Sequence, residues 1–405
     1  MRCKRVATSR RSARRHRASA TVLVAAWLLS ARAGADPLRL RADAVADTQT
    51  ETQSPTGLVV LQGEDKLRPW LGVEGLVWTG TKPGLTGDVL VLALHMREPH
   101  GYGELRVGRF VVATGAIFPV QIDGAEAIGR TPWGSTLEAF GGAPVVPRFG
   151  ARTYDWLAGV RVAQHVASTV TMGVSYMQRR DDGEISNEEL GADFAAAPAP
   201  WLDVAAKGAY DLTSPGIADG RVSAATRVDA YRFELFASEQ SPGRLLPATS
   251  LFSVLGDFPS EMIGGTVRWA AAPRLDVLAS GAGQLVGAEL GMNAWIRSTL
   301  RFDEHGKGSI GLEVRRVDVS AARWTGFRVV GMQPLGGGFR FSSELEVAVP
   351  DDPNGRGVAW PWGLAALGWR SKGWEVAGAI EAASTPEYRY EANALARLSR
   401  TLELP

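Results

Sequence analysis

Residues 339–349 read FRFSSELEVAV, a sequence in which apolar and polar side chains alternate. Large apolar side chains, among them Leu345 and Val347, stand at alternate positions, and Glu344 and Glu346 stand between them. Successive side chains of a β-strand point to opposite faces. The stretch therefore predicts a strand with one apolar face and one charged face.

The same pattern recurs along the chain. Segments of about ten residues alternate apolar and polar side chains and end at Gly, Pro, Asp or Asn, as at 202–211, 231–235 and 374–381. No Pro/Ser-rich linker and no amphipathic helical run interrupts residues 38–404. We expect an all-β chain: a transmembrane, antiparallel, up-and-down β-barrel of about 20 strands, within a range of 16 to 22.

A secreted β-sandwich or β-solenoid would also alternate, but its apolar face is buried and needs large side chains to fill a core. Here Ala and Gly occupy many alternating positions, and the polar face carries both charges at high density. Several Trp residues, such as Trp70, Trp201, Trp269 and Trp374, lie near segment ends, as in the aromatic girdles of membrane barrels. The membrane barrel is the favoured interpretation.

The N-terminus predicts export. A basic stretch from Arg2 to Arg17, an apolar run from Ala20 to Leu29 and the sequence Ala-Gly-Ala before Asp36 together resemble a secretory signal. A transit peptide or a basic nucleic-acid arm is the alternative. We expect residues 1–35 to be a signal peptide, residues 36–405 to be one barrel, and the location to be the outer membrane of a Gram-negative cell.

The charge and the cysteine count exclude several classes of function. Nine Lys or Arg and no Asp or Glu precede Asp36, so 35 basic and 43 acidic side chains follow and the exported chain is net −8. This balance argues against a nucleic-acid partner. The single cysteine, Cys3, lies in the signal. No disulfide framework, no thiolate metal site and no covalently attached haem are therefore expected, and no cofactor is predicted.

The lengths of the connections suggest which end of the barrel faces outward. With twenty strands counted from Leu38, every even-numbered connection is short, and the longest ones are odd-numbered, including 115–152 and 240–262. Outer-membrane barrels combine tight periplasmic turns with long external loops. We therefore expect 115–152 to be a long third external loop and 240–262 to be another external loop.

The third loop is rich in apolar residues and should pack either inside the lumen or as a flap over its mouth. In rank, length and composition it resembles the third loop of general porins, which folds inward and narrows the channel. That resemblance implies a role for Asp123 and Glu126 opposite Arg106 and Arg109. A looser resemblance, carried by LPATSLFSVLGD at 246–257 and Val107 to Phe110, is to barrels of high-GC Gram-negative genomes that have no assigned activity.

The candidate residues for the pore lining or its constriction are charged positions on the expected lumen faces and in the third loop. They are Arg106, Arg109, Asp123, Glu126, Arg130, Arg232, Glu234, Arg340, Glu344 and Glu346. No catalytic or metal-binding residues are predicted. The four His after the signal lie in turns or on separate strands, without the spacing of a helical zinc motif, and no Ser-His-acid set stands out.

The leading hypothesis is a porin-like channel for passive passage of small hydrophilic solutes, not an enzyme. The alternative is a barrel that serves as a sheath or scaffold for a partner, either a periplasmic electron carrier or an export complex. Expected partners are outer-membrane lipid and the barrel assembly machinery, and a second copy of the chain or a periplasmic protein is left open.

Overall fold

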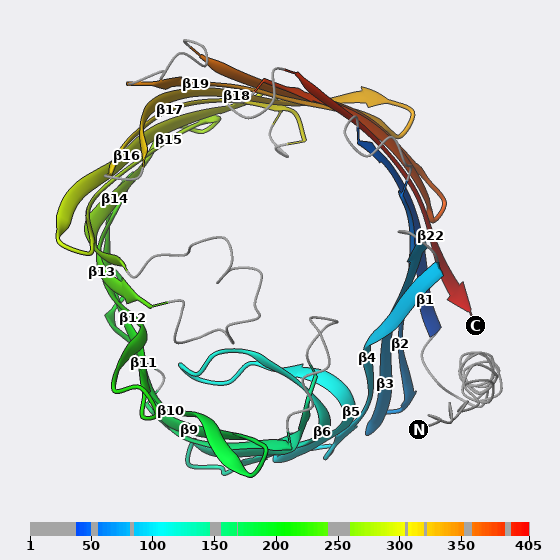
Figure 1. The fold of residues 1–405 in the computed structure, drawn as a ribbon, viewed down its shortest axis with the longest axis vertical. Coiled ribbons are helices and arrows are strands. Elements are labelled where there is room, and N and C mark those ends of the chain that lie inside the picture. The colour runs from blue at the N-terminus through cyan, green and yellow to red at the C-terminus, as the bar shows by residue number, and fades with distance from the viewer. Residues whose placement is uncertain are drawn as a thin grey trace, which may run out of the picture.

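A computed structural model describes residues 38–49, 56–81, 85–145, 155–167, 169–241, 260–303, 307–319, 322–351, 359–384 and 390–404. These residues form a single antiparallel sheet of 22 strands, in which each strand pairs with the next along the chain. The first and last strands pair with each other from Leu38↔Leu404 to Gln49↔Asn393, which closes the sheet into a barrel (Figure 1).

The strand bounds are β1 Leu38–Gln49, β2 Thr56–Arg68, β3 Leu71–Thr81, β4 Leu85–Arg97, β5 Gly103–Val112, β6 Val120–Arg130, β7 Ser135–Pro144, β8 Trp156–Val166, β9 Val170–Asp181, β10 Glu184–Ala199 and β11 Leu202–Asp211. They continue as β12 Gly216–Val228, β13 Tyr231–Gln240, β14 Ser260–Ala272, β15 Leu275–Val286, β16 Glu289–Arg301, β17 Ser309–Val319, β18 Ala322–Gly336, β19 Phe339–Pro350, β20 Trp360–Ser371, β21 Trp374–Ala383 and β22 Glu391–Leu404.

The closed antiparallel barrel agrees with the sequence, but the count of twenty strands was too low by two. Both missing strands, β6 and β7, lie within 115–152, so that range is not one long external loop. The described connection between β5 and β6 is only 113–119. Alternation is weak in β6 and β7 because side chains on their lumen faces, such as Ile122 and Phe140, are buried like core residues.

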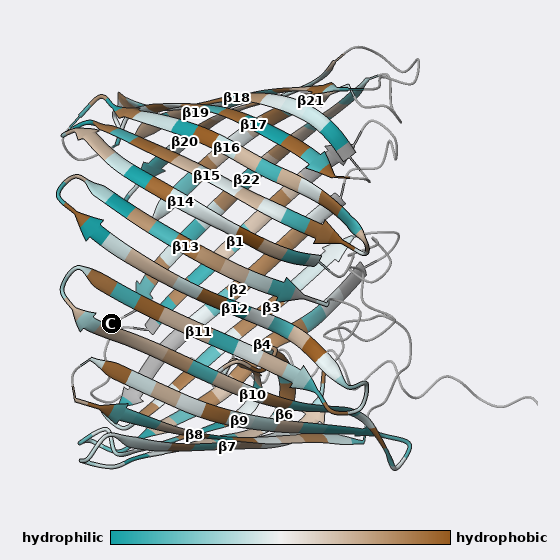
Figure 2. Cartoon of the chain, turned by 90° about the vertical axis from the view of Figure 1, so that its left-hand side faces the viewer, coloured by the Kyte–Doolittle hydropathy of each residue, from teal (hydrophilic) through white to brown (hydrophobic). Residues whose placement is uncertain are grey.

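The predicted connection 240–262 is also longer than the one between β13 and β14. Gln240 ends β13 and Ser260 begins β14, and residues 242–259 lie outside the described residues, as does the predicted signal peptide at 1–35. Because the two missed strands are consecutive, every other connection stays at the end of the barrel at which it was predicted. Figure 2 shows the tilted strands and the tight turns gathered at one end of the barrel, here called the short-turn end.

The two faces of the wall differ as the alternation predicts. On β19, Leu345 is 59 % exposed on the outer face, whereas Glu344 on the inner face accepts a hydrogen bond from Arg328 of β18. The same division holds on β13, where Leu235 is 70 % exposed outside and Glu234 pairs with Arg221 inside. An apolar outer face and an ionic inner face are the arrangement of membrane barrels.

Aromatic side chains collect on the outer face at the short-turn end. Tyr231 stacks on Trp269 with ring centroids 5.8 Å apart, and the Arg400 guanidinium lies 4.5 Å from the ring of Trp374. Aromatic rings of this kind are favoured at the level of the lipid headgroups. Within the described ranges, no helix is long and apolar enough to cross a membrane.

Candidate functional site

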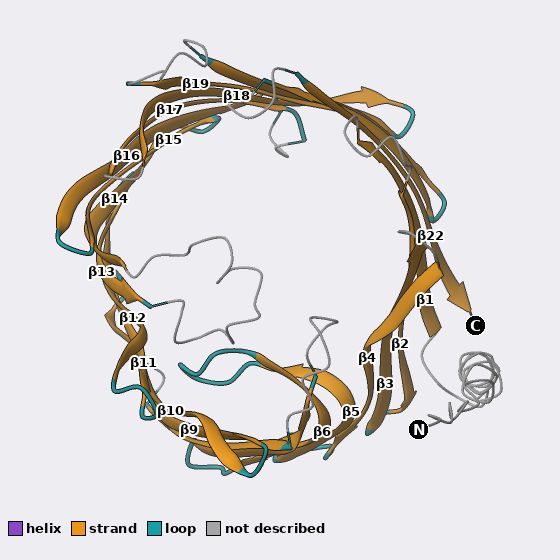
Figure 3. Cartoon of the chain, viewed as in Figure 1, coloured by secondary structure: helices purple, strands orange, loops and turns teal. Residues whose placement is uncertain are grey.

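The ends of β5 and β6 leave the barrel wall and enter the lumen. We call residues 109–123, which comprise these strand ends and the connection 113–119, the arch. In Figure 3 the connection is the teal segment inside the ring of strands. Thr114 and Phe118 of this connection contact lumen-side glutamates of β7 and β10, so it lies against the lumen side of the wall rather than over the barrel mouth. This part of the chain is therefore folded into the lumen and is not an external flap over the barrel mouth.

A row of glycines marks the line along which the sheet bends. Gly108, Gly124 and Gly142 stand opposite one another on β5, β6 and β7. A Cβ on Gly124 would lie 2.1 Å from the carbonyl oxygen of Gly141, and Gly108 has a φ of +132° with the carbonyl oxygen of Leu92 2.1 Å from its Cβ position. Backbone approaches of this kind accept only glycine. The bend is therefore encoded in these three positions.

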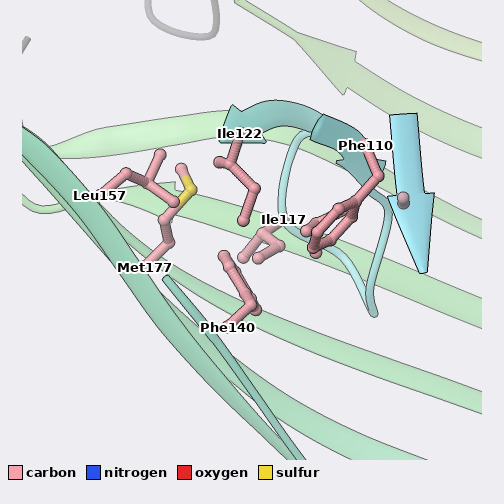
Figure 4. Packing of buried hydrophobic residues seen from close by; sticks show 8 residues of the cluster. Phe110, Ile117, Ile122, Phe140, Leu157 and Met177 are labelled. Atoms are coloured by element: carbon pink, nitrogen blue, oxygen red, sulfur yellow. The ribbon is translucent and has the colours of Figure 1, made fainter. Parts of the chain in front are cut away.

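An apolar core fills the space between the arch and the wall. Phe110, Ile117 and Ile122 of the arch point toward Phe140, Leu157 and Met177 of β7, β8 and β9 (Figure 4). Phe110 and Ile122 are 0 % exposed and Leu157 is 1 % exposed. Burial of such side chains stabilises by about 1.5 to 3 kcal/mol each relative to exposure. The arch is consequently packed on the wall as a second layer.

Two glutamates of the wall hold the tip of the arch. The Thr114 hydroxyl donates a hydrogen bond of 2.6 Å to Glu138 of β7, and the backbone N–H of Phe118 donates one of 3.2 Å to Glu189 of β10. Both carboxylates are buried, at 7 % and 3 % exposure. Buried carboxylates need hydrogen-bond partners, and here the arch supplies them.

The inward bend leaves part of β4 without a strand partner, because β5 pairs with β4 only from Leu92↔Arg109 downward. Side chains of the arch occupy that edge instead. Arg109 donates to the carbonyl oxygen of Val89 over 2.9 Å, and the Gln121 amide donates to the carbonyl oxygen of Leu90. In a bilayer, backbone groups at a sheet edge must be satisfied within the protein. Arg109 and Gln121 thus complete the wall where the arch departs.

The two arginine–carboxylate pairs expected near the third loop are neighbours across one hairpin. Arg109 binds Asp123 through two hydrogen bonds of 2.6 and 2.7 Å, and Arg106 stands opposite Glu126 in the register. Arg106 also bonds Glu74 of β3 and lies over the Phe110 ring, 4.5 Å from its centroid. These groups do not face one another across the pore, so they set up no transverse field of the general-porin kind.

Most of the other predicted residues line the inner face at separate places. Arg130 reaches Glu104 of β5 at the short-turn end, 3.3 Å away. Glu234 pairs with Arg221 over 3.2 Å. Arg340 stands between the uncharged Pro334 and Gly368, Glu346 stands opposite Arg328, and Arg232 stands opposite Arg227 and Arg268. They do not form one constriction with the arch.

A ladder of charges crosses four strands on another part of the lumen wall. Glu313 of β17, whose side chain is 5 % exposed, accepts hydrogen bonds from Arg297 (2.7 Å) and Arg315 (2.8 Å). Arg328 lies 4.0 Å from Glu313 and donates to Glu344 over 2.6 Å. Of this ladder, sequence reasoning had identified only Glu344. The ion pairs of the ladder depend on strand register, which brings residues of four strands together.

Thr114, Gln121, Glu138 and Glu189 were also absent from the predicted set. No local signal identifies them, because their roles arise from the bend and from contacts between distant strands. Within the described residues, no group of three or more His, Cys, Asp or Glu is arranged to hold a metal ion.

Comparison with known proteins supports the fold alone. No family model and no curated protein matches the sequence. The P pilus usher PapC translocation pore is similar with a TM-score of 0.52 and 10 % identity, covering 91 % of this chain and 100 % of that chain. PapC in an E. coli P pilus tip assembly intermediate has a TM-score of 0.50 and 11 % identity, over 92 % and 61 %. Pseudomonas aeruginosa OccK5 has a TM-score of 0.43 and 10 % identity, over 91 % and 98 %.

Proposed function

We propose that this protein is an outer-membrane channel for passive passage of small hydrophilic solutes, with the arch narrowing the lumen from one side. The observation that carries the proposal is the inner face itself. It is an ionic surface of paired charges along a closed wall whose outer face is apolar, and a hydrated lumen is the environment in which both faces are stable.

The arch has the position that a constriction requires. It is a two-stranded segment inside the barrel wall. Because it packs on β7, β8 and β9, it is held in one position and is not a free lid. Val111 and Phe118 of the arch are 44 % and 37 % exposed, and the Arg109–Asp123 pair lies at its base, next to the glycine row. The proposal includes no catalytic role for any of these residues.

The test is the single-channel conductance of a variant with a shortened arch. Val112 and Val120 stand opposite each other in the β5–β6 register, so residues 113–119 can be replaced by Asn-Gly, which forms a two-residue hairpin turn. The matched control replaces Gly287–Ala288, the turn between β15 and β16, with the same dipeptide.

Both variants should assemble, since each keeps all described strands. In planar bilayers the shortened arch should raise conductance above that of the parent, and the control should leave it unchanged. Equal conductance in all three proteins would place the arch outside the ion path. No conductance in any of them would overturn the channel.

A sheath or scaffold role is the second candidate, and the strand number favours it. Barrels of 16 to 18 strands leave an aqueous channel, whereas 22-stranded barrels of the outer membrane hold a plug within the lumen. With 22 strands this chain encloses room for an occupant beside the arch. The usher pore that shares its fold is a translocation pore, and a partner-filled barrel would be silent in the conductance test.

A further inference from the structure

Three arginines form a row across neighbouring strands of the lumen wall near the short-turn end. Arg227 of β12 stands opposite Arg232 of β13, and Arg232 stands opposite Arg268 of β14. All three side chains are exposed, on the face opposite to that of Val228 and Phe233, which point outward at 55 % and 40 % exposure. The guanidinium groups therefore project into the lumen.

The carboxylates near this row do not balance it. Asp203 lies 3.5 Å from Arg227, and Asp276 lies 3.4 Å from Arg268 but also bonds Arg301 of β16. Glu234, the acidic side chain two positions from Arg232, pairs with Arg221. Asp229, in the turn between Arg227 and Arg232, forms no ion pair within the part of the chain that the structure describes, and counting it with these side chains gives five arginines and four carboxylates. Arg232, at the centre of the row, has no ion pair among the described residues.

Such a row is unfavourable for the barrel alone. Like charges that stand directly opposite on neighbouring strands destabilise a sheet. Neighbouring strands are about 4.8 Å apart, so the row offers three forked donors over roughly 10 Å. A monovalent anion can engage only one or two of them. A solute with two adjacent oxyanion groups can engage the whole row and relieve the repulsion.

We propose that Arg227, Arg232 and Arg268 form a binding site for small polyvalent oxyanions, the chemistry shared by polyphosphates and polycarboxylates. Guanidinium groups bind phosphate and carboxylate oxygens through paired, charge-assisted hydrogen bonds, and rings of Arg or Lys select anions in pores. The proposal rests on the proposed channel function and specifies its substrate class: the row is the point in the lumen at which anionic solutes pause.

Binding can be measured without conductance. Isothermal titration calorimetry on the detergent-solubilised barrel would compare pyrophosphate, citrate and acetate. Wild type should bind pyrophosphate, citrate or both more tightly than acetate, and the two probes show which oxyanion is preferred. Arg232→Gln should weaken binding roughly tenfold or more, as expected for loss of a charge-assisted pair. Arg232→Lys should recover part of the loss because it restores the charge without the fork.

The control is Arg340→Gln, which removes the same charge from the lumen face of β19, where the cross-strand neighbours Pro334 and Gly368 are uncharged. It should leave the Kd unchanged. Equal weakening by Arg232→Gln and Arg340→Gln, or wild-type binding of both polyvalent probes no tighter than that of acetate, would overturn the site. Currents carried by potassium chloride distinguish the two proposals. If the barrel conducts but does not bind the polyvalent probes, the channel is retained and the binding site is rejected. If it binds the probes but does not conduct, the binding site is retained and the channel is rejected.

Discussion

The Thr114 hydroxyl lies 2.6 Å from Glu138, and both side chains are nearly sealed from solvent. This contact joins the tip of the arch to the wall of the barrel. Thr114→Val keeps the shape of the side chain and removes the donor, which leaves Glu138 buried without it. We expect the arch to lose about 1 to 3 kcal/mol of local stability.

Hydrogen exchange checks this expectation. Amide protection should fall in residues 113–122, whereas the amides of β15 and β16 should be unaffected, because the barrel wall does not depend on the contact. Thr114→Ser retains the hydroxyl and should behave like the parent. Equal loss of protection throughout the sheet would show that the arch and the wall unfold as one unit.

The glycine row predicts a sharp dependence on side-chain size. Gly124→Val should prevent the bend, because its Cβ would meet the backbone of Gly141 and Gly142. Gly208→Val is the matched control, since a Cβ on this strand glycine meets nothing within 4 Å. The heat-modifiable gel shift of folded barrels should be lost or reduced for Gly124→Val only. Similar assembly of both variants would contradict a bend fixed by Gly124.

The alternation on β19 predicts opposite results for adjacent positions. Arg in place of Val347 puts a charge on the outer face and should destabilise assembly by roughly 2 to 4 kcal/mol near the bilayer midplane. Arg in place of Glu346 puts it in the lumen, opposite Arg328, and should be tolerated much better. The amount of folded barrel in the outer-membrane fraction measures both. Equal damage from the two substitutions would reverse the assignment of faces.

The edge of β4 predicts a role for Gln121 that has nothing to do with solutes. Gln121→Leu removes the donor to the Leu90 carbonyl, and Gln121→Asn shortens its reach. We expect a lower unfolding temperature for the Leu variant, because a carbonyl at an open sheet edge is left unsatisfied. Conductance of the assembled Leu variant should stay close to that of the parent. A large change in ion selectivity with no change in stability would argue for a pore-lining role instead.

Much of this fold could be predicted from the alternation of apolar and polar residues in the sequence. FRFSSELEVAV sets both faces of β19, and the turn-forming residues separate strands well enough that 20 of the 22 strands could be counted. Alternation could not reveal β6 and β7, because the arch covers their lumen faces and Ile122 and Phe140 are buried there. Large apolar side chains at lumen positions break the expected alternation, so these strands look like a packed loop when only periodicity is considered.

The candidate site was less accessible to sequence reasoning. The resemblance to general porins implied that Asp123 lies near the arginines of the preceding strand, but it gave no indication of the contacts of Arg109 with β4. The arginine row depends on the register of β12, β13 and β14, which aligns Arg227, Arg232 and Arg268 although 41 positions separate the first from the last. Register is set by turn geometry and pairing.

The seam between β1 and β22 has a consequence for the order of events during folding. Asp43 accepts a hydrogen bond from Ser399, 356 positions away, and the Arg39–Glu403 pair spans the same junction. Contacts of such separation form late, because the intervening chain must be brought into place first. Until then β1 presents an unpaired edge, which invites pairing with other chains. The chain is therefore most exposed to aggregation in the interval before β22 pairs with β1. A catalyst of barrel assembly would act by binding the free edge of β1 during that interval.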